Sequence, residues 1–400
     1  MLVLNNHEAT VDAAKTAIKA KGTPDFSKIA PNDTEKDGLY MAEDDEGESY
    51  YYRGAVRNNY VSFAGFLWRI IRRNGDGSVR LIYSGKSVSD TADATIGNFQ
   101  FNSKYWDPTY VGYKYNEDFS LHENNGVTNY SRFNTTQKYN YGTGYTFDET
   151  TKKFTLTGDI KELTWKDNHD EIVSEQLYSC LNTDCNVVHK VTGYVNEYSM
   201  KVQPINYGSN SLLLSQTNQI DSPIKTKLDN WYQSNLTNYS SYIADETFCN
   251  DRSVTSGTGY KIDSPTYYGA RDRLDNKKTP SLKCGGDNDK FRLSNASAKL
   301  DYPISLITAD EVTLAGGVRN TTNTNYYLYN SRYFWTLSPS RFYSDNSSAN
   351  VWSVVSSGSL HPWSIVSYSL GVRPVINLKA NTLITKGDGT SLNPFVIAEK

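Results

Sequence analysis

The chain has 400 residues and a formal net charge of −3, with 41 Lys and Arg against 44 Asp and Glu. This balance lacks the basic excess that binds nucleic acids and anionic membranes, so neither is an expected partner. The mean hydropathy of −0.61 indicates a polar surface, and no apolar run is long enough to cross a bilayer. The length suits one large domain with an insertion, or two domains, and 31 Tyr and 7 Trp can supply a sizeable core.

The N-terminal segment predicts a helix over residues 5–21. Its alanines, Val11 and Ile18 form a weak apolar stripe, and Gly22-Thr23-Pro24 ends the pattern. Such a helix fits either the remainder of a longer anchoring or pilin-like stalk or a simple docking helix. The first four residues lack the basic segment and the full apolar core of a signal peptide. We therefore expect that a native export signal or anchor has been removed, with a cytosolic protein as the alternative.

From Gly38 onward the pattern is that of β-strands. Residues 49–54, 59–72 and 78–83 read as strands, and the Asn-Gly-Asp-Gly turn at 74–77 predicts a hairpin between the last two.

Charged side chains are frequent in this β region. Arg69, Arg72, Arg73 and Arg80 alternate with apolar residues, a pattern that could bind nucleic acid but at this net charge indicates a solvated strand face. The adjacent acids at 44–46 resemble a catalytic carboxylate pair. Acids in a turn are usually solvated, so we assign them no catalytic role.

Residues 123–205 differ from both flanks. After a stretch rich in Asn, Thr and Tyr, the segments KKFTLTGDIKELTW and VVHKVTGYVNEYSMKV alternate between apolar and polar residues. We interpret this region as a small antiparallel β-rich insertion.

The four cysteines fall into two pairs. Cys180 and Cys185 frame a short loop, whereas Cys249 and Cys284 lie farther apart. An even count of this kind indicates two disulfides and an oxidising compartment. The alternative is zinc, but the Cys-x4-Cys spacing is poor for that metal and His189 alone does not complete a tetrahedral set.

Two helices are predicted in the second half of the chain. Ser222-Pro223 caps and begins the first, and Thr308 to Glu311 forms a capping box that begins the second, which Gly316-Gly317 ends. Short, well-separated helices among many short strands predict an α+β fold.

The segment from Tyr333 to Leu378 mixes two kinds of residue. Apolar and backbone-specifying residues read as a framework of short strands, with alternation at Trp352 and Val354. Between them lie Ser, Tyr, His, Asp and Asn without a motif of their own. Tyr supplies contact area and Ser supplies adaptable hydrogen bonding, so this composition is typical of a recognition surface.

Several segments together resemble large secreted surface proteins of gut Firmicutes that have a C-type-lectin-like fold. The segments that carry the resemblance are SYYYRGAV, NNYVSFAGFLWRIIRRNGDGSVRLIYSG, WYQSNL, ADETFCNDRS, YPISLITADEVTLAGG, FWTLSPS and GVRPVINL. They cover most of residues 38–122 and 222–400. The resemblance implies a C-type-lectin-like domain at 31–122 and 206–400, with an N-terminal helix in residues 1–30 and the β-rich insertion at 123–205.

Some proteins of that fold are diversified by retroelements, which rewrite a C-terminal segment at template adenines. Residues 340–370 resemble such a variable region, because the residue types that mutated asparagine codons produce crowd this stretch; Trp363 needs another template codon or is fixed. The resemblance implies a framework held by Trp335, Pro339, Trp352 and the strand at 371–378. The residues expected to form the recognition surface are Arg341, Tyr343, Ser344, Ser353, Ser356, Ser359, His361, Trp363, Ser364, Ser367 and Tyr368.

The sequence contains no constellation that would carry catalysis or metal binding. It lacks the Glu-Pro-Asn, Gln-Pro-Asp and Trp-Asn-Asp triplets of calcium-dependent lectins, and Asp345 with Asn346 offers too few oxygens for calcium. Formylglycine-generating enzymes share the broad fold but need cysteines near the C-terminus, and the last cysteine here is Cys284. We therefore expect no enzymatic activity, no cofactor and no metal. The prediction is an extracellular protein of the bacterial surface with an unknown protein or glycan ligand and a membrane link only through a removed anchor; the alternative is a fixed-specificity adhesin or glycan-binding module.

Overall fold

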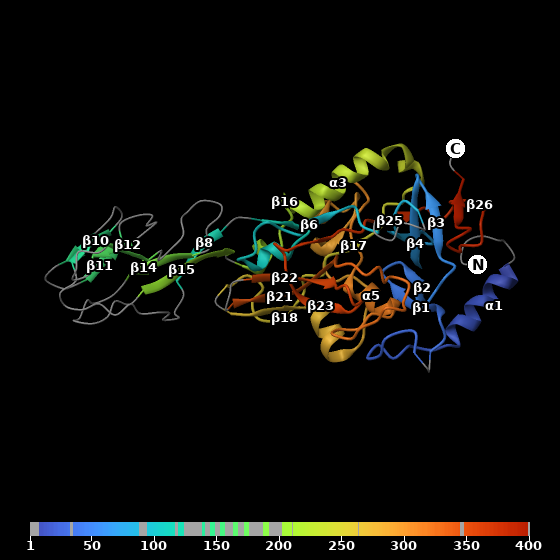
Figure 1. Cartoon of the computed structure of the whole chain (residues 1–400), viewed down its shortest axis with the longest axis horizontal. Coiled ribbons are helices and arrows are strands. Elements are labelled where there is room, and N and C mark those ends of the chain that lie inside the picture. The colour runs from blue at the N-terminus through green and yellow to red at the C-terminus, as the bar shows by residue number, and fades with distance from the viewer. Residues whose placement is uncertain are drawn as a thin grey trace.

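The computed structural model has an α+β fold in which sheets predominate (Figure 1). It describes residues 8–32, 35–87, 94–116, 211–262, 264–344 and 348–398, together with the strands that lie between residues 119 and 209. Two large sheets, of eight and seven strands, organise the molecule.

The eight-stranded sheet brings both ends of the chain together. Its strands are β1 (Gly38–Asp44), β2 (Gly47–Arg53), β3 (Tyr60–Phe63), β4 (Phe66–Arg73), β5 (Val79–Tyr83), β25 (Val375–Leu378), β26 (Ile384–Lys386) and β27 (Phe395–Ile397). Strand β4 pairs with β2, β3 and β5, and the C-terminal strands join through β25 on β5 and β27 on β3.

One predicted strand of this sheet is divided in two. Residues 59–72 were expected to form a single strand, but Ala64 and Gly65 have φ angles of 52° and 76° and turn the chain back between β3 and β4. Two consecutive positive φ angles are what a tight two-residue hairpin requires. The second hairpin, at Asn74 to Gly77 between β4 and β5, is confirmed.

The seven-stranded sheet contains the C-terminal segment. Its strands are β6 (Asn98–Gln100), β18 (Val254–Ser256), β19 (Thr266–Tyr268), β21 (Phe334–Tyr343), β22 (Ser348–Val354), β23 (Leu360–Ile365) and β24 (Ser369–Gly371). The order β18-β19-β21-β22-β23 places β21 and β22 at the centre. Smaller two-stranded pairs join β7 (Lys114–Tyr115) to β16 (Ile220–Asp221) and β17 (Phe248–Cys249) to β20 (Lys290–Phe291).

The predicted helices are present. The described part of the N-terminal helix is α1 (Glu8–Lys19), while α3 (Pro223–Asn235) begins at the Ser222 cap and α5 (Ala309–Ala315) begins at the Thr308 capping box. The shorter helical segments are α2 (Leu212–Ser215), α4 (Gly269–Arg271), η2 (Pro108–Val111), η3 (Thr237–Tyr242), η4 (Asp272–Lys277), η5 (Asp287–Asp289) and η6 (Ala296–Ala298). Within the described part of the chain, no helix combines the length and apolar character of a membrane span.

The strands between residues 119 and 209 pair only with one another. They are β8 (Phe119–Glu123), β9 (Lys138–Asn140), β10 (Tyr145–Asp148), β11 (Lys153–Leu156), β12 (Leu163–Lys166), β13 (Ile172–Glu175), β14 (Val187–Val191) and β15 (Val202–Ser209), and all their pairings are antiparallel. Figure 1 shows them at one end of the molecule, away from both chain termini. The predicted Cys180–Cys185 pair lies outside the described residues.

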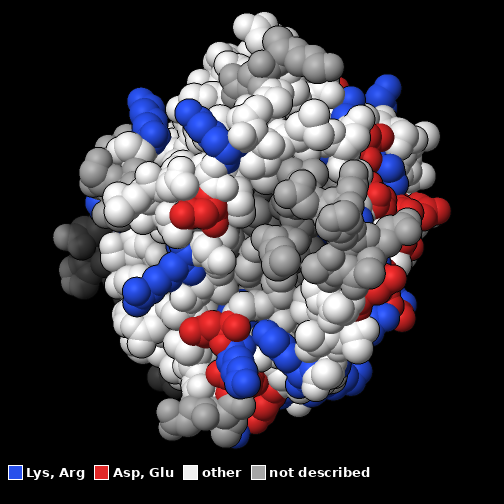
Figure 2. Space-filling model, turned by 90° about the vertical axis from the view of Figure 1, so that its right-hand side faces the viewer, with Lys and Arg blue, Asp and Glu red and all other residues white. Residues whose placement is uncertain are grey.

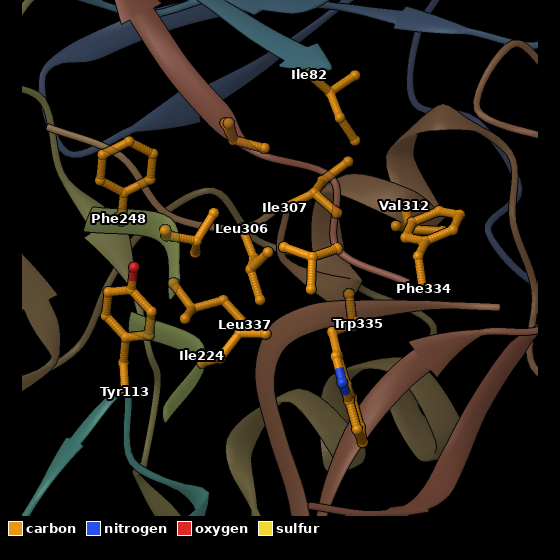
Figure 3. Close-up of a cluster of buried hydrophobic side chains, with 14 of the residues drawn as sticks. Ile82, Tyr113, Ile224, Phe248, Leu306, Ile307, Val312, Phe334, Trp335 and Leu337 are labelled. Carbon is orange, nitrogen blue, oxygen red and sulfur yellow. The ribbon is translucent and has the colours of Figure 1, made fainter. Parts of the chain in front are cut away.

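The hydrophobic core lies between the two large sheets and the helices. Figure 3 shows side chains from β5, α3, β17, α5 and β21 that point into one interior, among them Ile82, Ile224, Phe248 and Val312. Each of these four side chains is fully buried. Because the contributing segments are far apart in the sequence, this core fixes the two sheets relative to each other.

A network of buried charges accompanies this core and corrects two expectations. Arg72 and Arg80 are 5% and 1% exposed, so the predicted arginine stripe is not a solvated face. Both guanidinium groups lie 3.1 Å from the Glu311 carboxylate of α5, and Arg72 also donates to Asp44 at 2.8 Å. Asp44, expected to be a solvated turn acid, is therefore a buried ion-pair partner, and it also accepts from the Gly75 backbone N–H at 2.9 Å.

The other two arginines of the predicted stripe differ from each other. Arg69 is 7% exposed and donates to the side-chain oxygen of Asn59 at 2.8 Å. Arg73 is half-buried. The alternation seen in the sequence is real, but most of these arginines lie beneath other elements of the fold.

The surface at the α1 and β26 end is mixed in charge. Figure 2 shows this end of the molecule, with basic side chains in several places next to acidic ones. One ion pair here joins Lys19 of α1 to Glu48 of β2. Such a mixture produces no single-sign field that would steer a charged partner to this end.

The segment η2 packs against β21 and β22 of the seven-stranded sheet. All four of its residues are buried, and the Asp107 carboxylate caps its first turn by accepting from the Thr109 N–H at 2.8 Å. Burial raises the pKa of Asp107 to about 7, although the backbone N–H groups of Thr109 and Ser209 favour the ionised form. Just before η2, the Tyr105 carbonyl accepts from the Ala349 N–H of β22.

We predict that Glu311→Gln lowers the free energy of unfolding by about 3–5 kcal/mol, because Arg72 and Arg80 remain buried beside an uncharged amide. Urea denaturation measures this change. The matched control is Glu43→Gln, which removes an exposed ion pair with Lys283 and should cost less than about 1 kcal/mol. Equal effects of the two substitutions would contradict the role assigned to Glu311.

Asp107 predicts a pH dependence of stability. Its carboxyl titrates near 3.8 when unfolded and at about 7 when folded, so the folded state retains a proton that the unfolded state has lost. This contribution to stability is full below about pH 4 and is lost as the pH rises towards 7, by up to about 1.4 kcal/mol per pH unit. Asp107→Asn keeps an acceptor for Thr109 and removes the titration. Urea denaturation from pH 5 to pH 8 should show a flatter profile for the variant, and parallel profiles would exclude the assignment.

Candidate ligand-binding face

The framework beneath the candidate face is fully buried. Trp335 on β21 and Trp352 on β22 are each 0% exposed, and Pro339 is buried between them in the sequence. The Trp335 ring N–H donates to the Phe99 carbonyl of β6 at 2.8 Å, and the Thr336 hydroxyl donates to the Trp352 carbonyl at 2.7 Å. These residues hold β21, β22 and β6 together.

Strand β22 is buried at every position, so the predicted alternation around Trp352 does not expose its polar residues. The strand is central in its sheet, between β21 and β23. A central strand covered on both faces needs no polar side.

Three serines of the predicted recognition surface therefore belong to the interior. Ser353, Ser359 and Ser364 are 0%, 6% and 4% exposed, and the hydroxyls of Ser353 and Ser364 lie 2.7 Å apart and bond to each other. Burial of a hydroxyl is tolerated because this bond satisfies it. These serines are part of the buried structure beneath the face, and they do not present hydroxyls to a ligand.

Four of the predicted residues converge on the surface above β21 and β23. The Arg341 guanidinium lies 4.5 Å from the centre of the Tyr343 ring and 5.5 Å from the centre of the Trp363 ring. The His361 ring meets Trp363 edge-on at 5.7 Å. Trp363 is 42% exposed, so part of its ring remains open to solvent beside a cation.

The structure adds three residues that the sequence did not indicate. The Arg319 guanidinium lies 5.4 Å from the Trp363 ring centre, and the Arg271 guanidinium lies 4.5 Å from the Tyr267 ring centre. We define the arginine–aromatic cluster as Tyr267, Arg271, Arg319, Arg341, Tyr343, His361 and Trp363.

Backbone pairing places these additional residues. Tyr267 of β19 lies opposite Arg341 of β21, and α4 follows β19 directly with Arg271 at its end. Arg319 forms a β-bridge with Leu360 at the start of β23. Because these contacts depend on strand pairing between distant segments, no spacing within the sequence could reveal them.

Among the residues that the structure describes, the cluster carries more positive than negative charge. Asp275 is the carboxylate bound there: it lies 2.7 Å from Arg319 and 3.6 Å from Arg271. Arg341 bonds instead to the neutral Asn350 side chain at 3.1 Å. Partial burial, followed by Arg271, lowers the pKa of the Arg341 guanidinium, which still remains protonated.

The same charges act on His361. Partial burial lowers its pKa, and Arg319 and Arg341 lower it further, so the imidazole is neutral at pH 7. His361 Nδ1 lies 3.4 Å from the Ser364 hydroxyl, which suggests a Ser–His nucleophile. Ser364 is almost fully buried and already bonded to Ser353, so it cannot reach a substrate in this arrangement.

The remaining predicted residues are spread around this cluster. Ser344 is half-buried just after β21, and Ser356 is exposed in the turn between β22 and β23. Tyr368 is 49% exposed after β23, and the neighbouring Ser367 carbonyl accepts from the Gln100 side chain of β6. The structure thus brings Arg341, Tyr343, His361 and Trp363 together, whereas Ser344, Ser356, Ser367 and Tyr368 are half-buried or exposed at other positions of the segment.

A group of three carboxylates elsewhere has the spacing of a metal site. The candidate ligand oxygens of Asp221, Asp229 and Asp301 lie within 4.8 Å of one another. The Lys225 ammonium, 0% exposed, donates to all three at distances of 2.6 to 2.9 Å. A built-in cation therefore fills the position that a metal would occupy. Asp345 and Asn346, considered from the sequence as calcium ligands, lie outside the described residues.

A second polar site lies beneath α5. It is a partly open pocket of about 30 Å³ lined by the Arg72, Arg80 and Glu311 side chains and by the Cys249–Cys284 disulfide, the pair expected from the sequence. Burial, with a further contribution from the charge of Asp76, raises the pKa of the adjoining Glu246 to about 7. The charged side chains that line the pocket pair with one another, so the site suits a structural ion network.

Comparison with known proteins gives no relative: no protein-family model, no curated protein and no solved structure matches the chain. The geometry of the face is therefore the main basis for a functional proposal.

The division between framework and face predicts opposite responses to substitution. Replacing Tyr343, His361, Trp363 and Tyr368 together with Ser should lower the free energy of unfolding by less than about 2 kcal/mol, because none of the four is buried and surface substitutions each cost within about 0.5 kcal/mol. Trp352→Ser alone should cost about 3–5 kcal/mol, because it empties a fully buried site. Thermal unfolding of both variants measures this. Collapse of the fourfold variant would show that these residues belong to the core.

Proposed function

We propose that this protein is a surface-displayed, ligand-binding protein whose C-terminal segment at 340–370 is a recognition site on a C-type-lectin-like domain. A retroelement diversifies that segment, the protein is extracellular on a bacterial surface, and it catalyses no reaction. The ligand is a protein or a glycan and not a nucleic acid.

The observation that carries the proposal is the arginine–aromatic cluster above a buried framework. In the same segment as the fully buried Trp352, the chain exposes Trp363 and Tyr368 by 42% and 49%. Large exposed aromatics beside arginine are typical of binding hot spots, where Trp, Tyr and Arg contribute most of the affinity. The buried framework beneath them can hold the backbone still while the face changes.

Two further observations support the proposed extracellular location and the proposed diversification. The Cys249–Cys284 disulfide fits an oxidising, extracellular environment. The resemblance of FWTLSPS and GVRPVINL to secreted proteins of the C-type-lectin-like fold supplies the retroelement hypothesis. FWTLSPS forms the first part of β21 in the sheet of the face, whereas GVRPVINL contributes β25 to the eight-stranded sheet.

We predict a near-copy of the 335–378 coding segment beside a reverse transcriptase gene, differing from it at adenines. In related strains, changes should concentrate at the codons of exposed and half-buried residues such as Tyr343, Ser356, His361 and Tyr368. The codons of Trp335, Pro339 and Trp352 should stay constant, because their side chains are buried. Sequencing the flanking DNA and the segment in several strains tests this. A constant segment without a template copy would instead indicate a fixed-specificity adhesin or glycan-binding module.

A further inference from the structure

We propose that the arginine–aromatic cluster binds an acidic segment of a partner protein, with Asp or Glu carboxylates paired to Arg271, Arg319 and Arg341. This inference rests on the proposed function, because it names the ligand chemistry of the same face.

The first argument is charge. Three guanidinium groups meet at the cluster, and Asp275 is the carboxylate that lies within ion-pair distance of two of them. Among the residues that the structure describes, the cluster is thus positive, on a chain whose net charge is −3. Such a local excess of arginine favours an acidic ligand, because complementary charges steer and orient a partner.

The second argument is the state of the arginine donors. Arg341 is half-buried, and its Nε donates to the neutral Asn350 side chain at 3.1 Å. The Arg271 and Arg319 side chains are 19% and 26% exposed and share the Asp275 carboxylate. Guanidinium N–H groups that reach solvent can pair with a ligand carboxylate in the planar geometry that they favour.

The third argument separates a protein from a glycan. A sugar ring usually binds by stacking on an open aromatic face, but the Arg319 and Arg341 guanidinium groups already lie over the Trp363 ring, at 5.4 and 5.5 Å. The combination that remains is exposed Trp and Tyr edges among arginines, together with adaptable serines at the margin. That composition is typical of protein–protein interfaces.

The experiment is a selection of random displayed peptides on the full chain. Counter-selection on the fourfold Ser variant of Tyr343, His361, Trp363 and Tyr368 retains the peptides that need the face. We expect the retained peptides to be enriched in Asp and Glu, and their affinity to fall as salt rises. Fluorescence anisotropy then measures the affinity of one retained peptide for each variant.

The arginine variants decide the inference. Arg319→Gln and Arg341→Gln should each lower the affinity for the peptide by about tenfold or more, equivalent to about 1.4 kcal/mol. Arg341→Lys keeps the charge but loses the planar fork, so it should weaken binding less than Arg341→Gln. Arg57→Gln removes the same charge at an exposed position outside the cluster and should leave affinity unchanged. Thermal unfolding of each variant shows whether it is folded.

The outcomes distinguish the two proposals. Peptides that need the face but lack acidic enrichment, or that tolerate both Gln variants, would overturn the acidic-segment inference and leave the recognition face intact. If the selection retains no face-dependent peptide, both proposals lose support. Competition of a retained peptide with poly-L-glutamate and with polygalacturonate tests the source of the carboxylates, and displacement by polygalacturonate alone would identify an acidic glycan and overturn the protein-partner inference.

Discussion

The arrangement of the two sheets depends on the interactions of the Glu311 carboxylate. This carboxylate accepts from the Thr308 N–H to cap α5, and it lies 3.1 Å from both Arg72 and Arg80 of the eight-stranded sheet. The same helix begins where the Ala309 N–H donates to Ser338 of β21 in the other sheet. Burial alone would raise the pKa of Glu311, but Arg80 and Arg72 outweigh it and keep the pKa below its ordinary value. Glu311 therefore connects the cap of α5 to the eight-stranded sheet, and the neighbouring Ala309 N–H connects the same helix to β21 of the other sheet.

This arrangement explains how a changeable face can exist on a stable protein. The framework residues of β21 and β22 pack inward against the shared core, while Trp363 points its ring to solvent. Substitution of an exposed side chain leaves that packing in place, because the hydrophobic stabilisation comes from area removed from water. Ser353 and Ser364 lie at the boundary between framework and face. They belong to the same segment as the exposed residues, yet their hydroxyls bond to each other beneath the surface.

The sequence predicted what depends on local chemistry and missed what depends on distant contacts. The capping box at Thr308, the Ser222 cap and the turn at 74–77 follow from short-range hydrogen bonding, and all three are present. The burial of Arg72 was missed because its partners, Asp44 and Glu311, come from two distant segments. The composition of the C-terminal segment and its resemblance to a variable region predicted four residues of the face, among them Arg341 and Trp363. Arg271 and Arg319 were not predicted, since only strand pairing brings them there.

The contrast between interior and surface arginines gives the face its chemical character. In the interior, Arg252 pairs with Asp289 at 2.7 Å, and Arg373 donates to the carbonyls of Tyr83 and Leu328, so each buried guanidinium has acceptors from the chain itself. At the cluster, Arg319 and Arg341 lie over an aromatic ring, where the attraction is weaker than that of a desolvated ion pair. Interior arginines thus have acceptors fixed by the chain, whereas at the face Arg341 donates to the neutral Asn350 side chain and Arg271 and Arg319 share one carboxylate, Asp275. A ligand that supplies carboxylates would gain there the interactions that the chain already makes for itself in the interior.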